Sequence, residues 1–243
     1  MDEPSGPTFH PLRILAAWGV HLFTACGLLT GFMALLAVAD HDWRSAIGWL
    51  LLSQFIDGID GTFARLVRVQ EVLPNFNGKT LDYVIDFATY AIIPAYFFFE
   101  SGLTEGTGVW IGTFAILLSS ALYYGKEGMV ADEQYFVGFP VLWNWVVFYL
   151  ILVFGFTPAW NLILVIFFAV LHFVPIKFAY PSRARRFKWL TLGFSALTIA
   201  AVLILLWRYP EPAPVWRWAA IAGGAYFGII AVLATWFDGA KLK

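Results

Sequence analysis

Two closely spaced pairs of acidic residues interrupt an otherwise apolar stretch of the chain: Asp57, Asp60, Asp82 and Asp86. A carboxylate at the centre of a bilayer costs about 3 kcal/mol on insertion scales, so these four aspartates need partners. Such a cluster does not stay ionised without cations. Carboxylate oxygens suit the hard divalent ions Mg²⁺ and Mn²⁺, which keep coordination positions free for phosphate. The four aspartates therefore predict a divalent-metal site.

Small residues share the predicted helical faces of the acids. The first pair of aspartates falls on one arc of a helix together with Gly61, Ala64 and Arg65. The second pair follows Gly78 at intervals of four residues and forms a narrow stripe with it. Glycine and alanine let a bulky group approach the backbone, although tight helix packing is the alternative reading for Gly61 and Ala64.

The depth of the acids in the helices gives a second indication. Asp57 lies eight residues before Arg65, and Asp86 lies eight residues after Gly78. Each of these aspartates is therefore about 12 Å from its reference residue along the helix axis. Two antiparallel helices would then present carboxylates at matching depths. The alternatives are helix-end charges or a cation transporter, but a transporter is expected to spread its acids across the membrane.

The rest of the chain is typical of a polytopic membrane protein. Its 243 residues are 60% hydrophobic and only 13% charged, whereas soluble domains carry about 25% charged residues. A membrane-spanning helix needs about 20 apolar residues. We expect an all-α protein with about eight transmembrane helices, in the windows 14–38, 43–68, 80–99, 108–124, 138–155, 158–179, 187–207 and 215–237.

The distribution of Lys and Arg predicts the orientation. If the loop 69–79 is cytoplasmic, that side holds 12 of the 15 basic residues, and the other side keeps Arg44, Arg208 and Arg217. Both termini are then cytoplasmic, and residues 1–12 form a short N-terminal segment before one integral membrane domain spanning 1–243. The net charge of −1 gives no reason to expect a nucleic-acid partner.

The acidic motif also carries a resemblance. The pattern Asp57-x2-Asp60-Gly61-x2-Ala64-Arg65, followed by Gly78-x3-Asp82-x3-Asp86, resembles the signature of the CDP-alcohol phosphotransferases. The 12 residues between Arg65 and Gly78 exceed the gap in many members and are similar to that of one branch, the bacterial phosphatidylcholine synthases. The segments 21–35, 135–150 and 175–192 are similar to that branch as well.

The resemblance implies a fold, a reaction and roles for the residues. The fold implied is a helical bundle like that of the CDP-alcohol phosphotransferases. The reaction implied by the branch is the condensation of CDP-diacylglycerol with choline to give phosphatidylcholine and CMP. The four aspartates would hold two divalent ions, Mn²⁺ or Mg²⁺, and Asp86 would also be the catalytic base. The CDP group would bind at Asp57, Gly61, Ala64, Arg65 and Gly78, with Arg65 on a phosphate or paired with an aspartate. A multi-pass protein of the bacterial inner membrane is implied, with its active site facing the cytoplasm and a homodimer expected by analogy alone.

The acceptor is the less constrained part of this interpretation. The quaternary ammonium of choline donates no hydrogen bond, so we expect aromatic faces to bind it. The residues predicted for this role are Tyr83, Tyr135, Trp143 and Asn144. Serine, glycerol phosphate or inositol phosphate are alternative acceptors. A membrane prenyltransferase also uses aspartates and Mg²⁺, but its motif lacks the Gly-x2-Ala-Arg after the second aspartate.

Overall fold

The structure, a computed structural model, describes residues 9–126, 130–131, 135–179 and 188–237. It is 80% helical with almost no strand. Within these described ranges, five helical segments are long and apolar enough to cross a membrane: Pro11–Ala39, Gly78–Glu100, Thr107–Tyr124, Lys188–Arg208 and Pro214–Trp236. The prediction of an all-α polytopic membrane protein is confirmed. Most of the expected N-terminal segment, and the basic residues between 183 and 186, lie outside the described residues.

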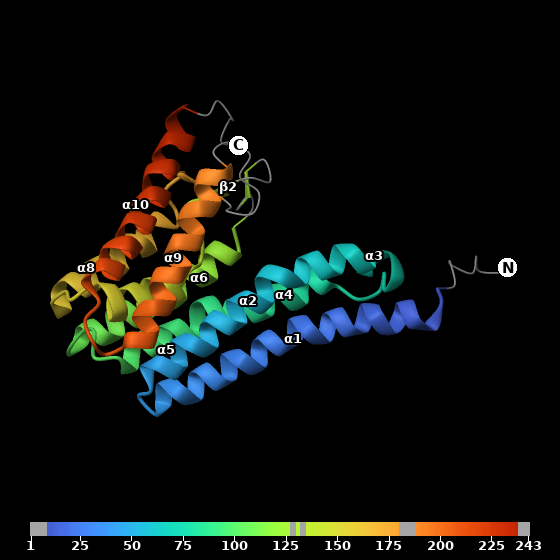
Figure 1. The fold of residues 1–243 in the computed structure, drawn as a ribbon, viewed down its shortest axis with the longest axis horizontal. Helices are drawn as coiled ribbons and strands as arrows, with labels where there is room; N and C mark the ends of the chain where they lie inside the picture. The colour runs from blue at the N-terminus through green and yellow to red at the C-terminus, as the bar shows by residue number, and fades with distance from the viewer. Residues whose placement is uncertain (1–8, 127–129, 132–134, 180–187, 238–243) are drawn as a thin grey trace.

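The helices and strands follow one another as labelled in Figure 1, where η denotes a π-helix. In chain order they are α1 (Pro11–Ala39), α2 (Trp43–Val67), α3 (Val69–Val72), α4 (Gly78–Phe87), η1 (Ala88–Ile92), α5 (Ile93–Glu100), α6 (Thr107–Tyr124), β1 (Val130–Ala131), β2 (Tyr135–Val137), α7 (Trp143–Phe148), η2 (Tyr149–Val153), α8 (Pro158–Leu171), β3 (Lys177–Ala179), α9 (Lys188–Arg208) and α10 (Pro214–Phe237). The segment α4–η1–α5 is one continuous helical rod.

Two of the eight predicted windows are too long. In the window 138–155 the helix begins only at Trp143, because Gly138 has φ 88° and donates its N–H to the carbonyl of Ile176 at 2.8 Å. In the window 158–179 the helix ends at Leu171, and the chain continues into β3. A small antiparallel sheet of order β1-β2-β3 occupies this region, with Tyr135 opposite Ala179. The hydropathy of these short apolar strands does not distinguish them from helix ends.

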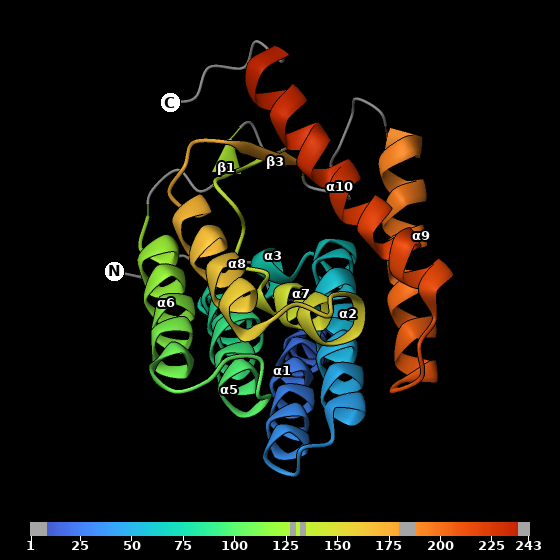
Figure 2. The same cartoon turned by 90° about the vertical axis from the view of Figure 1, so that its left-hand side faces the viewer.

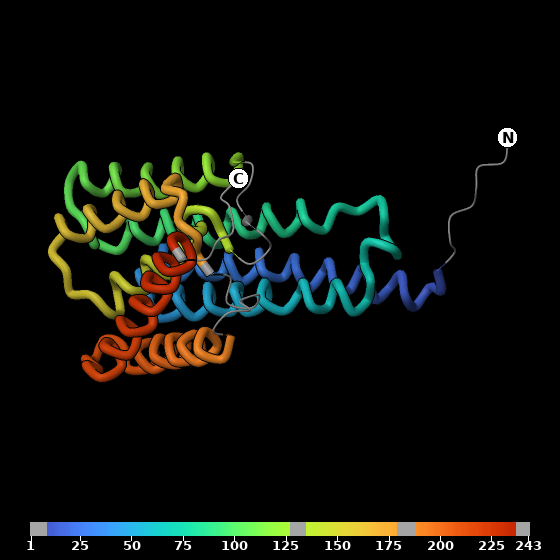
Figure 3. The backbone as a smooth tube through the Cα atoms, turned by 90° about the horizontal axis from the view of Figure 1, so that it is seen from above, coloured from blue at the N-terminus to red at the C-terminus, as the bar shows by residue number. Residues whose placement is uncertain are grey.

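Helices α1 and α2 form an antiparallel hairpin that positions the first pair of aspartates. A tight turn joins them, with His41 at φ 55°. Asp42 then caps α2, because its carboxylate accepts the backbone N–H of Ser45 at 3.0 Å. That hydrogen bond lowers the pKa of Asp42. Seen from above, the hairpin and the start of α4 extend beyond the other helices toward the N-terminal end (Figure 3).

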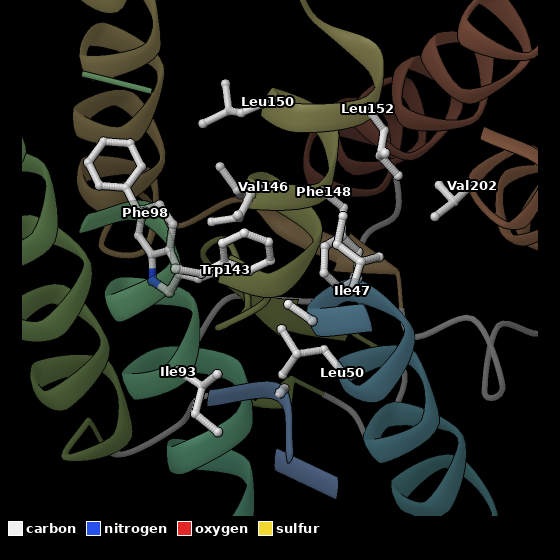
Figure 4. Close-up of a cluster of buried hydrophobic side chains, with 14 of the residues drawn as sticks. Ile47, Leu50, Ile93, Phe98, Trp143, Val146, Phe148, Leu150, Leu152 and Val202 are labelled. Carbon is white, nitrogen blue, oxygen red and sulfur yellow. The ribbon is translucent and has the colours of Figure 1, made fainter. Parts of the chain in front are cut away.

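The short segment α7–η2 lies at the centre of the protein. Figure 2 shows it in the middle of the bundle, with α2, α5 and α8 around it. Trp143, Val147 and Phe148 are fully buried. Figure 4 shows α7 side chains between Ile47 of α2 and Phe98 of α5. Because protein surrounds α7, its length need not match the thickness of a bilayer.

Candidate active site

Helix α1 sets the spacing of the two helices that carry the aspartates. On one side, the hydroxyl of Ser53 in α2 donates to the carbonyl of Gly27 at 3.1 Å. On the other side, a Cβ at Gly27 would lie 3.2 Å from Cγ2 of Ile85, and a Cβ at Gly31 only 2.9 Å from Cγ2 of Thr89. Small residues allow such close helix contacts. α1 therefore holds α2 and the α4–η1 rod near each other.

Three of the four predicted metal-binding aspartates converge between these helices. Asp57 comes from α2, whereas Asp82 and Asp86 lie one turn apart on α4. One carboxylate oxygen from each lies within 4.8 Å of the other two. All three side chains are half-buried, which leaves the group open to a ligand. We call these residues the three-aspartate cluster.

The fourth aspartate lies outside this cluster. Asp60 is 7% exposed, and the hydroxyl of Thr24 in α1 lies beside its carboxylate. The nearby Arg65 is exposed and donates to the hydroxyl of Thr62 at 3.1 Å. The spacing of the motif put Asp60 on the acidic face of α2, but helical periodicity does not show that α1 covers this position.

The predicted CDP-binding residues have different surroundings. At Gly61 a Cβ would meet only the Arg65 guanidinium, at 3.4 Å, so the backbone there is accessible. Ala64 is half-buried against α1 and α3, in a cluster with Val69 and Val72. At Gly78 a Cβ would lie 2.7 Å from the ring of His21. Close packing of α4 on α1 is thus one reason for glycine at position 78, whatever its contact with nucleotide.

A tyrosine that the motif does not include also belongs to the site. Tyr90, in η1, is 6% exposed, and its hydroxyl donates to Oδ2 of Asp57 at 2.8 Å. It continues the spacing of Asp82 and Asp86 by a further four residues, so the stripe itself is a signal that could have found it. π-Helical turns occur frequently at functional sites. Sequence periodicity alone does not predict the π-turn.

Polar residues continue from the cluster toward the protein centre. Asn144 in α7 is buried and donates from Nδ2 to Oε1 of Gln54 at 3.3 Å. Gln54 lies on α2 three residues before Asp57. The structure thus places Asn144 near the acidic helices, whereas Trp143 beside it is fully buried against His172, with 5.3 Å between ring centroids.

Aromatic rings also lie beside the cluster. Tyr83 and Phe87, on α4, both meet Tyr124 at the end of α6 edge to face, with centroid distances of 6.0 and 5.5 Å. Tyr124 lies near the three-aspartate cluster. Tyr83 is a predicted residue of the acceptor pocket, and its ring forms one group with the rings of Tyr124 and Phe87. Tyr135, also predicted, lies in β2, where it pairs with Ala179.

The cluster fits a divalent metal ion. Carboxylates are the preferred ligands of Mg²⁺ and Mn²⁺. Oxygens on opposite sides of one Mg²⁺ are about 4.2 Å apart, so a small rotation of the side chains would bring this oxygen set onto one ion. Three carboxylates this close repel one another until a cation joins them. The arrangement can therefore bind metal and, through it, a diphosphate.

Comparison with known proteins yields several relatives that cover most of the chain. A phosphatidylcholine synthase of Rhizobium johnstonii is 38% identical over 231 residues, 93% of this chain and 93% of the relative. One of Bradyrhizobium diazoefficiens is 41% identical over 195 residues, 80% of this chain and 72% of the relative. One of Pseudomonas aeruginosa is 35% identical over 224 residues, 92% and 94% respectively. No family model matches the chain.

Proposed function

Because the chain belongs to the family of phosphatidylcholine synthases, we propose that it transfers the phosphatidyl group of CDP-diacylglycerol to choline and releases CMP. Membership of this family makes the protein a phosphatidyltransferase. The sequence resemblance to that branch of the CDP-alcohol phosphotransferases is thereby confirmed. The observation that supports metal-dependent transfer is the convergence of Asp57, Asp82 and Asp86 within 4.8 Å, and the choice of choline as acceptor rests on the names of the relatives.

The four aspartates would hold the divalent ions, with the three-aspartate cluster supplying the closest oxygens. Bound there, Mn²⁺ or Mg²⁺ would offset the charge of the diphosphate and of the departing CMP. Asp60, whose carboxylate lies beside the Thr24 hydroxyl of α1, would be the fourth ligand. The exposed guanidinium of Arg65 is free of the cluster and suits a phosphate oxygen. Gly61, whose backbone is accessible, would face the cytidine and its diphosphate, and Ala64 and Gly78, which pack against α1, remain predicted members of the CDP site.

Asp86 is the proposed base. It lies in the part of the cluster supplied by α4, one helical turn after Asp82. Its carboxylate would accept the proton of the choline hydroxyl as the oxygen forms a bond to the phosphatidyl phosphorus. The bond from that phosphorus to the oxygen of CMP breaks in the same displacement, and CMP departs with the electron pair. Atoms and charge then balance without a covalent enzyme intermediate.

The acceptor pocket would be the group of rings beside Asp82 and Asp86. A quaternary ammonium is attracted to aromatic faces and to nearby carboxylates. Tyr83 and Tyr124 offer both within one space, because they meet each other edge to face and lie next to the cluster. Tyr135, Trp143 and Asn144 remain predicted members. Since Trp143 is fully buried, choline could reach it only after a rearrangement of α7.

The protein is a multi-pass membrane protein. We further propose that it lies in the bacterial inner membrane, as one catalytic domain, with both termini and the active site on the cytoplasmic side. The charge asymmetry of the loops supports this orientation. CDP-diacylglycerol would enter the site from the surrounding membrane lipids, and choline would enter it from the cytoplasm.

A transferase assay tests this function directly. Purified protein in detergent, with CDP-diacylglycerol and Mn²⁺, is given choline or serine, and the release of CMP is measured. We expect CMP with choline, none with serine, and none after chelation of the metal. Release with serine alone would contradict choline as the acceptor. Absence of CMP with every alcohol, together with cation flux in liposomes, would favour a transporter.

A further inference from the structure

We propose that Tyr90 is a positioning residue of the metal site, whose hydroxyl fixes the orientation of the Asp57 carboxylate. This inference rests on the proposed function in taking the three-aspartate cluster as the metal site. It goes beyond that function, because Tyr90 lies outside the acidic motif and is not itself a predicted ligand. The hydrogen bond from Tyr90 Oη to Asp57 Oδ2, at 2.8 Å, is the observation that carries it.

The hydrogen bond from Tyr90 restricts the rotation of the Asp57 carboxylate. Rotation about the Cβ–Cγ bond of an aspartate is broad and roughly two-fold, so an unrestrained carboxylate presents its oxygens in many directions. A phenol that donates to one oxygen selects a narrow range of these. Asp57 is the cluster's contribution from α2, so its orientation decides whether the oxygens of both helices meet at one point.

Tyr90 is itself held rigidly. Its side chain is 6% exposed and belongs to the main hydrophobic core. The residue before it, Thr89, packs against Gly31 of α1 and donates its hydroxyl to the carbonyl of Ile85 at 3.0 Å. The wide turn of η1 thus presents the Tyr90 hydroxyl from a fixed backbone, and hydrogen-bond donors to metal ligands orient those ligands in this way.

The alternative is that the bond only satisfies a buried hydroxyl. Other partly buried tyrosines show what that role looks like: Tyr149 donates to the carbonyl of Ala220 at 2.7 Å, and Tyr123 to that of Val137 at 3.2 Å. Both use backbone carbonyls away from the cluster. Tyr90 instead donates to a side chain of the cluster, that of the proposed metal ligand Asp57. Tyr149 is therefore a matched control for loss of a buried hydroxyl.

The test measures metal binding without substrate. Mn²⁺ is titrated into purified Tyr90→Phe, Tyr149→Phe and unmodified protein in detergent, and free Mn²⁺ is followed by electron paramagnetic resonance. We expect Tyr90→Phe to weaken Mn²⁺ affinity about tenfold or more, as loss of an outer-shell partner does, and Tyr149→Phe to leave it unchanged. An unchanged affinity in Tyr90→Phe would overturn the proposal.

A second measurement needs no purified protein. Melting of each variant is followed in solubilised membranes with and without Mn²⁺. A positioning role predicts that Tyr90→Phe loses most of the stabilisation that Mn²⁺ provides. A purely structural role lowers the melting temperatures with and without Mn²⁺ equally, so that the stabilisation by Mn²⁺ is unchanged. That result would overturn the proposal even for a weakly stable variant.

A double-mutant comparison of Tyr90 with Asp57 provides a third test. If Tyr90 acts through Asp57, Tyr90→Phe adds no further loss of Mn²⁺ affinity in an Asp57→Asn background, and independent, additive losses contradict it. Failure of the proposed function looks different. If the unmodified protein binds Mn²⁺ but releases no CMP with choline, the proposed reaction is contradicted and the role of Tyr90 is not. If the unmodified protein binds no Mn²⁺, both proposals are contradicted.

Discussion

Two regions of this protein enclose polar groups in apolar surroundings, and they do so in opposite ways. The three-aspartate cluster between α2 and α4 combines half-buried carboxylates with small residues on α1. The other region centres on His172, which is fully buried. The rings of Tyr123, Phe139 and Trp143 surround it, with centroid distances of 5.3–5.5 Å.

The polar atoms of the two regions also differ in their partners. Nδ1 of His172 lies 2.8 Å from the carbonyl of Phe168, and its Nε2 and Trp143 Nε1 have no hydrogen-bond partner among the described residues. The carboxylates of the cluster instead lie within 4.8 Å of one another, where a divalent cation could join them. Rings can close around a neutral group, whereas a group of like charges demands a counter-ion. The three-aspartate cluster is therefore suited to binding a cation, and the region around His172 to packing.

The sharpest test of this contrast removes one charge from the cluster. We expect Asp86→Asn to slow CMP release from CDP-diacylglycerol and choline by about 10²–10⁴-fold, because the amide cannot accept the acceptor's proton. Asp42→Asn is the matched control, since Asp42 caps α2 away from the cluster and asparagine caps equally well. Turnover of Asp86→Asn close to that of the control would remove Asp86 as the base.

The packing region should respond in stability instead. Trp143→Ala empties a fully buried site, so we expect a loss of about 3–5 kcal/mol of unfolding free energy, seen as a lower melting temperature. The Mn²⁺ affinity of the protein that remains folded should not change. Trp143→Phe separates this reading from the predicted contact with choline. A raised KM for choline in that variant, with melting unchanged, would place Trp143 in the acceptor pocket.

A smaller effect is expected at the rings beside the cluster. Tyr124→Leu removes an aromatic face, and a cation–π contact contributes about 0.5–2 kcal/mol. That corresponds to a rise of about two- to thirtyfold in the KM for choline, with the KM for CDP-diacylglycerol unaltered. Tyr124→Phe keeps the face and should resemble the unmodified protein. Equal changes in both KM values would show that Tyr124 serves the whole site rather than the acceptor.

The comparison also shows what the sequence could reveal. Acidic spacing and hydropathy identified the helices that carry the cluster, because charge in an apolar helix needs a reason. They did not separate Asp60 from the other three, since that depends on how α1 covers α2. Nor did they find η1, because a π-turn changes backbone phase without changing composition. The short strands were missed because a few apolar residues fit either a strand or a helix end.

The same reasoning gives a last prediction, at the glycine that sets the position of η1. A Cβ at Gly31 would lie 2.9 Å from Thr89 Cγ2 and 3.0 Å from Ile93 Cδ1. Gly31→Ala must therefore push η1 away, and overpacking of this kind costs about 1–3 kcal/mol. Because Tyr90 follows Thr89, we also expect a weaker Mn²⁺ affinity. Gly19→Ala, on the same helix with open space around it, should do neither. If Gly31→Ala lowers the melting temperature but keeps Mn²⁺ affinity, the spacing set by α1 serves the packing of the helices and not the geometry of the metal site.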